Sequence, residues 1–98
     1  MSPYVVHLTL TIAPERQDEF ERLLAVEAPL TRGFSGCELF EIYVGPTPGE
    51  IIFLEHWRSE AASQAYTQWR TERGDMERLA AFFVAPPRAL SLRRIATP

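Results

Sequence analysis

Two segments in the middle of the chain, residues 37–44 and 51–57, are apolar at both odd and even positions. Phe40, Ile42 and Val44 alternate with Leu39 and Tyr43, and Ile51 and Phe53 alternate with Ile52 and Leu54. Because successive side chains of a strand point to opposite faces, a sheet built from these strands is apolar on both faces. A chain of 98 residues has too few residues to cover both. We therefore expect a homodimer in which two sheets pack face to face around a closed, barrel-like core.

The remaining segments alternate between strand and helix patterns. Residues 4–12 are apolar at every second position, which predicts a strand. Pro14 and the acidic residues that follow it predict a helix start, and Pro29 and Gly33 predict that this helix ends by about residue 30. Its apolar stripe contains one carboxylate, Glu27.

The second half of the chain repeats this plan. Glycines and prolines at 45–49 predict a hairpin turn between the two central strands. Ser59 is a candidate cap for a second helix with Tyr66 and Trp69 on its inner face. Gly74 then separates a third helical segment that extends to Phe83, and a last strand is predicted over about residues 88–95.

This order of elements predicts one α+β domain over residues 1–98. It is the ferredoxin-like split βαβ plan, with a four-stranded antiparallel sheet, all helices on one face, and dimerisation into an α+β barrel.

Composition excludes several classes of partner and cofactor. The net charge is -3 and the arginines are dispersed, so we do not expect nucleic acid as a partner. No apolar run approaches the roughly 20 residues that span a bilayer, and no leader pattern is present, so we expect no membrane partner and a cytoplasmic location. One cysteine and two histidines argue against a metal site, and the lack of a glycine-rich phosphate loop argues against a nucleotide or flavin, so no cofactor is predicted.

Three pieces of the sequence resemble the antibiotic biosynthesis monooxygenase superfamily of small dimeric α+β barrels. They are residues 15–20, 36–43 and 53–62, and the resemblance extends over about residues 4–85. Its most specific piece is E-x-W-x-S-x-x-A, formed here by Glu55, Trp57, Ser59 and Ala62, followed by an amphipathic helix. The resemblance implies a pocket between the helices and the sheet, and oxygenation of anthrones or quinols without metal or flavin. Haem-degrading relatives carry Asn where Val6 stands and Trp where Tyr66 stands, which disfavours that activity.

Four residues are candidates for catalysis. His56 and Glu55 could each act as the base, but neighbours on a strand face opposite ways, and the sequence leaves open which one meets the pocket. Glu27 either reaches water at a frayed helix end or lines the pocket as an acid or base. The Tyr66 hydroxyl could orient a phenolic substrate or bind a developing oxyanion.

Five further residues are candidates for substrate binding. The Trp69 indole could stack on a flat ring, although core packing explains it equally well. Arg73 could pair with Glu27 or with an anionic substrate if the second helix extends that far. The apolar residues that would exclude water are Val6, Phe53 and Phe83.

These features lead to three functional hypotheses. The first is a cofactor-independent monooxygenase that combines a quinol-like or polycyclic aromatic substrate with molecular oxygen. The second is an isomerase, cyclase or lactone-processing enzyme on the same fold, and oxygen dependence would separate it from the first. The third is a non-enzymatic dimer that binds a small hydrophobic ligand.

Overall fold

Four strands and three helices follow one another in the order that the sequence predicts. The computed structural model describes residues 3–97, so Met1, Ser2 and Pro98 of the predicted domain lie outside it. The elements are β1 (Tyr4–Thr11), a 3-10 turn η1 (Pro14–Arg16), α1 (Gln17–Arg32), β2 (Cys37–Val44), β3 (Glu50–Trp57), α2 (Glu60–Glu72), α3 (Asp75–Ala80) and β4 (Arg88–Leu92). The sheet order is β2-β3-β1-β4 and every pairing is antiparallel. The predicted ferredoxin-like α+β fold is thereby confirmed.

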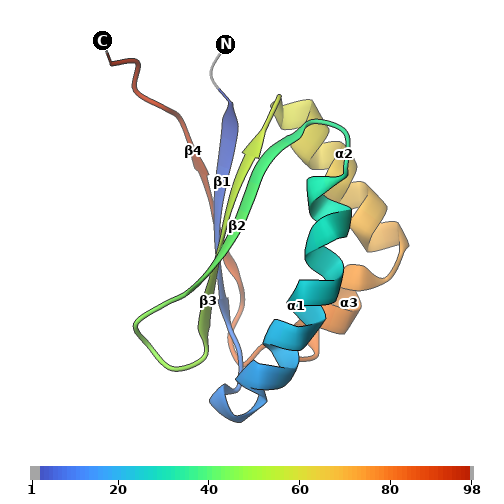
Figure 1. The fold of residues 1–98 in the computed structure, drawn as a ribbon, viewed down its shortest axis with the longest axis vertical. Coiled ribbons are helices and arrows are strands. Elements are labelled where there is room, and N and C mark those ends of the chain that lie inside the picture. The colour runs from blue at the N-terminus through green and yellow to red at the C-terminus, as the bar shows by residue number, and fades with distance from the viewer. Residues whose placement is uncertain (1–2, 98) are drawn as a thin grey trace.

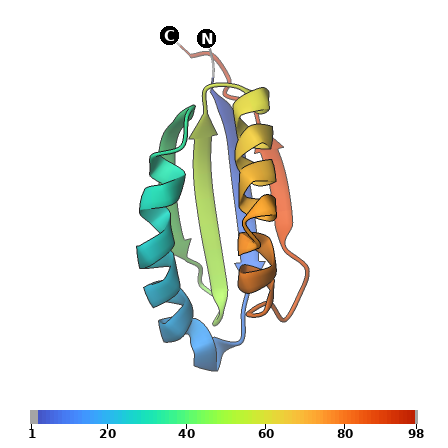
Figure 2. The same ribbon diagram turned by 90° about the vertical axis from the view of Figure 1, so that its right-hand side faces the viewer.

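The helices form one layer and the sheet forms the other. All three helices lie on the same face of the sheet (Figure 1). Seen from the helical side, α1 crosses the half of the sheet that contains β2, and α2 with α3 crosses the other half (Figure 2). Within residues 3–97, no helix is long and apolar enough to cross a membrane.

The strand register decides which side chains meet the helices. On β3, Glu55 pairs with Val6 of β1 and with Phe40 of β2. The next residue, His56, pairs with Val5 and Leu39. Paired residues share a face, and Phe40 packs in the core beneath α1. Glu55 therefore faces the helices, and His56 lies on the opposite face.

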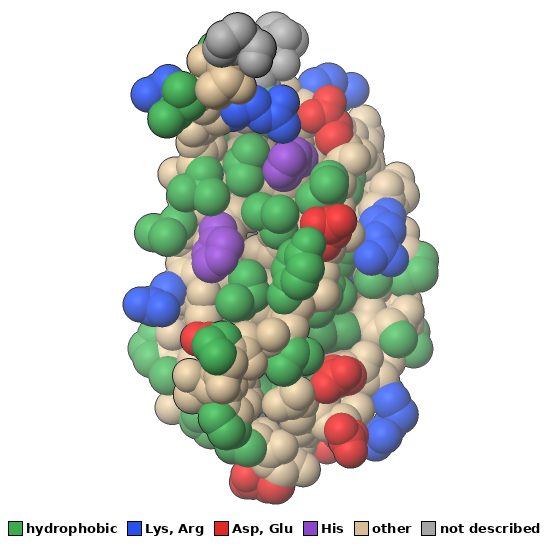
Figure 3. Space-filling view, turned by 60° about the vertical axis from the view of Figure 1, so that its left-hand side comes forward, with side chains coloured by type: hydrophobic (Ala, Val, Ile, Leu, Met, Phe, Trp, Pro, Cys, Tyr) green, Lys and Arg blue, Asp and Glu red, His purple; other side chains and the backbone are tan. Residues whose placement is uncertain are grey.

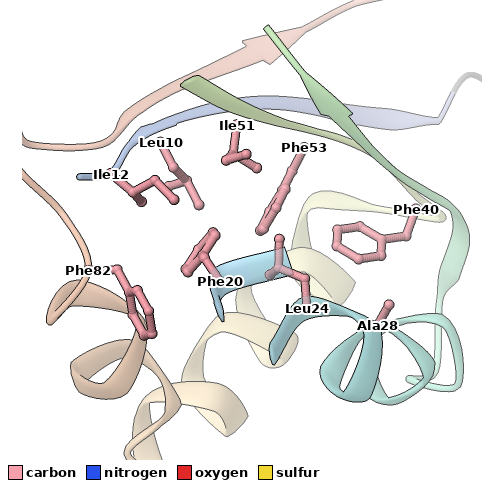
Figure 4. Packing of buried hydrophobic residues seen from close by; sticks show 9 residues of the cluster. All are labelled: Leu10, Ile12, Phe20, Leu24, Ala28, Phe40, Ile51, Phe53 and Phe82. Atoms are coloured by element: carbon pink, nitrogen blue, oxygen red, sulfur yellow. The ribbon is translucent and has the colours of Figure 1, made fainter. Parts of the chain in front are cut away.

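A cluster of apolar side chains joins α1 to the sheet. Phe20, Leu24 and Ala28 of α1 point at the strands in Figure 4, and Phe82 closes one end of the cluster. The sheet contributes the other buried members, Leu10, Ile12, Phe40, Ile51 and Phe53. This packing fixes α1 against the half of the sheet that contains β2 and β3.

Three element ends differ from the sequence-based expectations. Helix α1 continues through Pro29 to Arg32. A proline removes one helical hydrogen bond, but Ala28 and Thr31 are buried on either side of it, and their packing holds the last turn. Helix α3 stops at Ala80, and Phe83 instead forms a bridge with Ile12. Strand β4 ends at Leu92, where its pairing with β1 ends.

The sheet face opposite the helices carries a broad apolar surface, which we call the open face. It includes Val5, His7, Thr9, Leu39, Glu41, Tyr43, Ile52, Leu54, His56, Leu90 and Leu92, and Arg88 lies at its edge opposite Thr9. Figure 3 shows apolar side chains spread over this side of the molecule with both histidines among them. Tyr43, Leu90 and Leu92 remain 43–57% exposed, and no element of the described chain covers them. Dimerisation through this face stays a prediction.

Candidate functional site

A cavity of about 470 Å³ lies between β1 and the layer formed by α2 and α3. Ten of its lining residues are apolar, and the polar ones are Glu55, Ser63, Tyr66 and Thr67. A narrow extension of about 70 Å³ shares Leu8, Phe53, Glu55, Tyr66, Met76 and Leu79 with it and reaches α1 at Glu27 and Thr31. We call the two spaces together the central cavity. Its size and apolar lining are typical of small-molecule sites.

Glu55 is the acidic side chain that borders both parts of the cavity. It is 8% exposed, and its Oε1 accepts a hydrogen bond of 2.8 Å from Trp57 Nε1. Burial raises the pKa of the Glu55 carboxyl, while the indole hydrogen bond and the charge of Arg70 oppose that rise. Within residues 3–97 its Oε2 has no hydrogen-bond partner, yet it is not sealed from solvent. Glu55 therefore presents one free carboxylate oxygen with raised proton affinity to an apolar space.

Tyr66 lies beside Glu55 and holds its hydroxyl in a polar network. Its Oη is 2.6 Å from Thr31 Oγ1 and accepts a hydrogen bond of 2.8 Å from Arg70 Nε. Burial raises the pKa of the Tyr66 phenol, and the bonds from Thr31 and Arg70 oppose that rise. Its ring packs on Trp57, with centroids 4.8 Å apart. Tyr66 is thus a neutral phenol in a fixed orientation rather than a base.

Arg70 is the centre of this network and is 5% exposed. Besides Tyr66, it donates to Asp75 Oδ2 at 2.6 Å, to Thr31 Oγ1 at 3.0 Å and to the backbone oxygen of Glu27 at 3.2 Å. The Glu27 carboxylate lies 3.5 Å from Arg70 Nη1. The guanidinium therefore ties α1 to α2 and to the start of α3.

Asp75 anchors the corner between α2 and α3. It follows Gly74, which has a φ of 79° that a side chain at this position would strain. Its carboxylate is 1% exposed and accepts hydrogen bonds from Arg70, Arg73 and Arg78. Three guanidinium groups compensate for the cost of burying this charge.

Five of the predicted site residues line the central cavity together, and a sixth lies at its narrow end. Glu55, Tyr66, Val6, Phe53 and Phe83 border the larger space. The Glu27 side chain is 17% exposed and borders the extension, because the helix does not fray before Pro29.

The other three predicted residues are not brought to the cavity. His56 lies on the open face, because it alternates with Glu55 along β3. Trp69 packs on Phe34, with ring centroids 5.1 Å apart, and so belongs to an aromatic cluster at the side of the cavity. Arg73 lies over the Trp69 ring and binds Asp75 instead of Glu27.

Sequence reasoning missed Arg70, Thr31 and Asp75. A helical signal existed for two of them, since Arg70 follows Tyr66 by four residues and Thr31 follows Glu27 by four, so each shares a helix face with a candidate that was found. The local pattern at Gly74 and Asp75 predicted only a break and a cap for the third helix, and the structure makes Gly74 the N-cap. The arginine partners of Asp75 become apparent only when α3 turns back on α2.

Comparisons with known proteins place this architecture in a family. The family model described as antibiotic biosynthesis monooxygenase matches residues 3–72, which run from β1 to the end of α2. The chain belongs to this family. No curated protein matches it. The family membership confirms the resemblance carried by Glu55, Trp57, Ser59 and Ala62.

Solved structures of similar fold agree over almost the whole chain. A conserved protein from Methanosarcina mazei superposes with a TM-score of 0.86 at 19% identity, covering 97% of this chain and 95% of its own. Rv0793 from Mycobacterium tuberculosis gives 0.84 at 20% identity and covers 98% of each chain. A Streptomyces coelicolor monooxygenase in complex with nanaomycin D gives 0.80 at 16% identity, covering 99% of this chain and 91% of its own. At these identities the likeness shows the shared fold of the antibiotic biosynthesis monooxygenases.

Proposed function

We propose that this family member is a cofactor-independent monooxygenase that acts on a quinol-like or polycyclic aromatic substrate. The observation that carries the proposal is the free Oε2 of Glu55, a carboxylate of raised pKa at the wall of an apolar cavity. The monooxygenase activity and the nanaomycin D ligand of the Streptomyces coelicolor neighbour support the reaction type and a small organic ligand.

The first step is proton transfer. The Glu55 carboxylate removes a proton from a phenolic hydroxyl or from the methylene group of an anthrone, because an apolar site strengthens a carboxylate as a base. The anion that forms is electron-rich enough to pass one electron to molecular oxygen. The cavity's contribution is to hold the ring beside Glu55 and Tyr66 and to keep water away.

The second step incorporates oxygen. The substrate radical and superoxide combine into a peroxide at the former methylene carbon of an anthrone, or at a hydrogen-bearing ring carbon conjugated with the oxygen of a phenolate, and the peroxide takes up the proton held by Glu55. Loss of water across the oxygen–oxygen and carbon–hydrogen bonds then leaves a carbonyl. For an anthrone the balance is one methylene and one oxygen molecule giving one carbonyl and one water, so two substrate hydrogens leave in the water and no external reductant is needed.

The experiment is oxygen uptake with anthrone in chelated, flavin-free buffer, followed by mass spectrometry after reaction under ¹⁸O₂. We expect uptake above autoxidation, one labelled oxygen in each quinone product, and loss of about 10²–10⁴-fold in rate in Glu55→Gln. Glu38→Gln makes the same change at an exposed site of β2 and is expected to retain the rate. A wild-type rate equal to autoxidation contradicts the proposal, and product formed without oxygen favours the isomerase or cyclase hypothesis.

The working unit is a homodimer joined through the open face. Exposed Tyr43, Leu90 and Leu92 leave an apolar surface on a face that no helix covers. A second copy presents the same surface, so two-fold packing of the sheets buries both at once. Large exposed apolar patches are typical of such interfaces.

A further inference from the structure

The central cavity is lined by acidic side chains and offers no available cation. Of the described residues that line its larger part, Glu55 is the one carboxylic acid, and none is Lys, Arg or His. The narrow extension adds Glu27 and Arg70. Arg70 is therefore the one cation among the lining residues that the structure describes, and its availability decides whether an anionic ligand can be bound.

All three nitrogens of the Arg70 guanidinium are already engaged by groups of the protein. A guanidinium has five N–H groups. Nε donates to Tyr66, Nη2 donates to Thr31 and to the Glu27 backbone oxygen, and Nη1 donates to Asp75 and lies 3.5 Å from Glu27 Oε1. Four hydrogen bonds and one ion pair thus engage all three guanidinium nitrogens. A ligand carboxylate would have to displace Asp75, Glu27 or Tyr66 to obtain the two-pronged contact that arginine makes with carboxylates.

Proton transfer to Glu55 leaves the total charge of the occupied site unchanged. A neutral substrate beside ionised Glu55 carries one negative charge, and its anion beside protonated Glu55 carries one as well. A substrate that also bears a carboxylate brings a second negative charge into an apolar space, where like charges repel strongly and desolvation is costly.

We propose that the central cavity selects uncharged flat ligands and rejects their carboxylated analogues, with Glu55 as the residue that determines this specificity. This inference rests on the proposed function for its ligand class. The selection of uncharged over carboxylated ligands concerns binding alone, so it can be measured without turnover.

The test uses two probes of nearly equal size, anthraquinone-2-carboxamide and anthraquinone-2-carboxylate, which differ at neutral pH by one charge. Titration calorimetry of the full chain at pH 7.5 is expected to give at least tenfold tighter binding of the carboxamide. In Glu55→Gln the ratio is expected to fall towards one, while Glu38→Gln retains it.

A second variant keeps the test independent of how Glu55→Gln folds. Thr67 is exposed on α2 at the cavity wall, so Thr67→Lys adds the missing cation without disturbing the core. We expect Thr67→Lys to strengthen binding of the carboxylate relative to the carboxamide by at least tenfold.

Equal or tighter binding of the carboxylate by the wild type, or an unchanged ratio in Glu55→Gln, overturns the proposal. If neither probe binds, the proposed ligand class, flat aromatic molecules, is wrong. Charge selection without oxygen uptake contradicts only the proposed oxygenation.

Discussion

Trp57 Nε1 donates a hydrogen bond of 2.8 Å to Oε1 of Glu55, the residue two positions earlier on the same face of β3. Both side chains are buried, and Trp57 has no exposed surface. The bond leaves Oε2 free and limits how far burial raises the pKa of Glu55. The sequence motif that identifies the family thus contains both the proposed base and the group that orients it.

Trp57→Phe tests this relationship. Loss of the indole donor removes the hydrogen bond that favours the ionised carboxylate, so the pKa of Glu55 is expected to rise further. The rising limb of the profile of kcat/KM against pH should move to higher pH. Trp69→Phe is the matched control, because Trp69 packs on Phe34 and makes no hydrogen bond to Glu55. An equal displacement in both variants would contradict a specific role for Trp57.

Glu55→Gln is expected to change how stability depends on pH. Burial raises the pKa of Glu55 in the folded chain, so the folded state still holds a proton at pH values at which the unfolded chain has lost it. Stability therefore falls as pH rises from the ordinary glutamate pKa through the raised one. Glu55→Gln removes this fall and should be more stable than the wild type above that window and similar below it.

Thermal unfolding of both proteins between pH 4 and pH 8 measures this effect. In a domain of this size, a difference on the order of 1 kcal/mol corresponds to about 4–8 °C in Tm. Glu38→Gln serves as the control for charge removal at an exposed site. Parallel Tm curves for the wild type and Glu55→Gln across the range would argue against a raised pKa.

The arginines around Asp75 are expected to contribute unequally. Arg70 is 6% exposed at its side chain and Arg78 is 54% exposed, although both bind the same carboxylate. Arg70→Ala leaves buried Asp75 and half-buried Glu27 without their shared cation and should cost about 3–5 kcal/mol of unfolding free energy. Arg78→Ala should cost about 1 kcal/mol or less. Urea unfolding measures both, and equal losses would show that burial does not govern this cluster.

The homodimer is expected to depend on the open face. Leu90→Glu places a charge on that face, where Leu90 is 57% exposed in one copy, and should yield monomers. Val26→Glu makes a comparable change on α1, where Val26 is 72% exposed, and should leave the dimer intact. Light scattering coupled to size-exclusion chromatography measures the mass. A wild-type monomer at micromolar concentration, or dimers in Leu90→Glu, would contradict the predicted interface.

Much of the fold follows from local patterns. Alternation of apolar residues located β1, and the β-rich run over residues 37–44 located β2. Ser59 caps α2 by accepting a hydrogen bond from the backbone N–H of Ala62, as its position before the helix predicted. Local patterns were less reliable at Pro29, where burial of the flanking residues outweighs the missing hydrogen bond.

The candidate site could be predicted only in part. The sequence by itself determined that Glu55 and His56 face opposite ways, because side chains alternate along a strand. Only the tertiary structure decided that Glu55 is the one inside, because this depends on the pairing of β3 with Val6 and Phe40 and on which face the helices cover. It likewise decided the role of Arg70: its spacing from Tyr66 indicates only a shared helix face, whereas its hydrogen bonds to partners 39 and 43 residues away arise from helix packing.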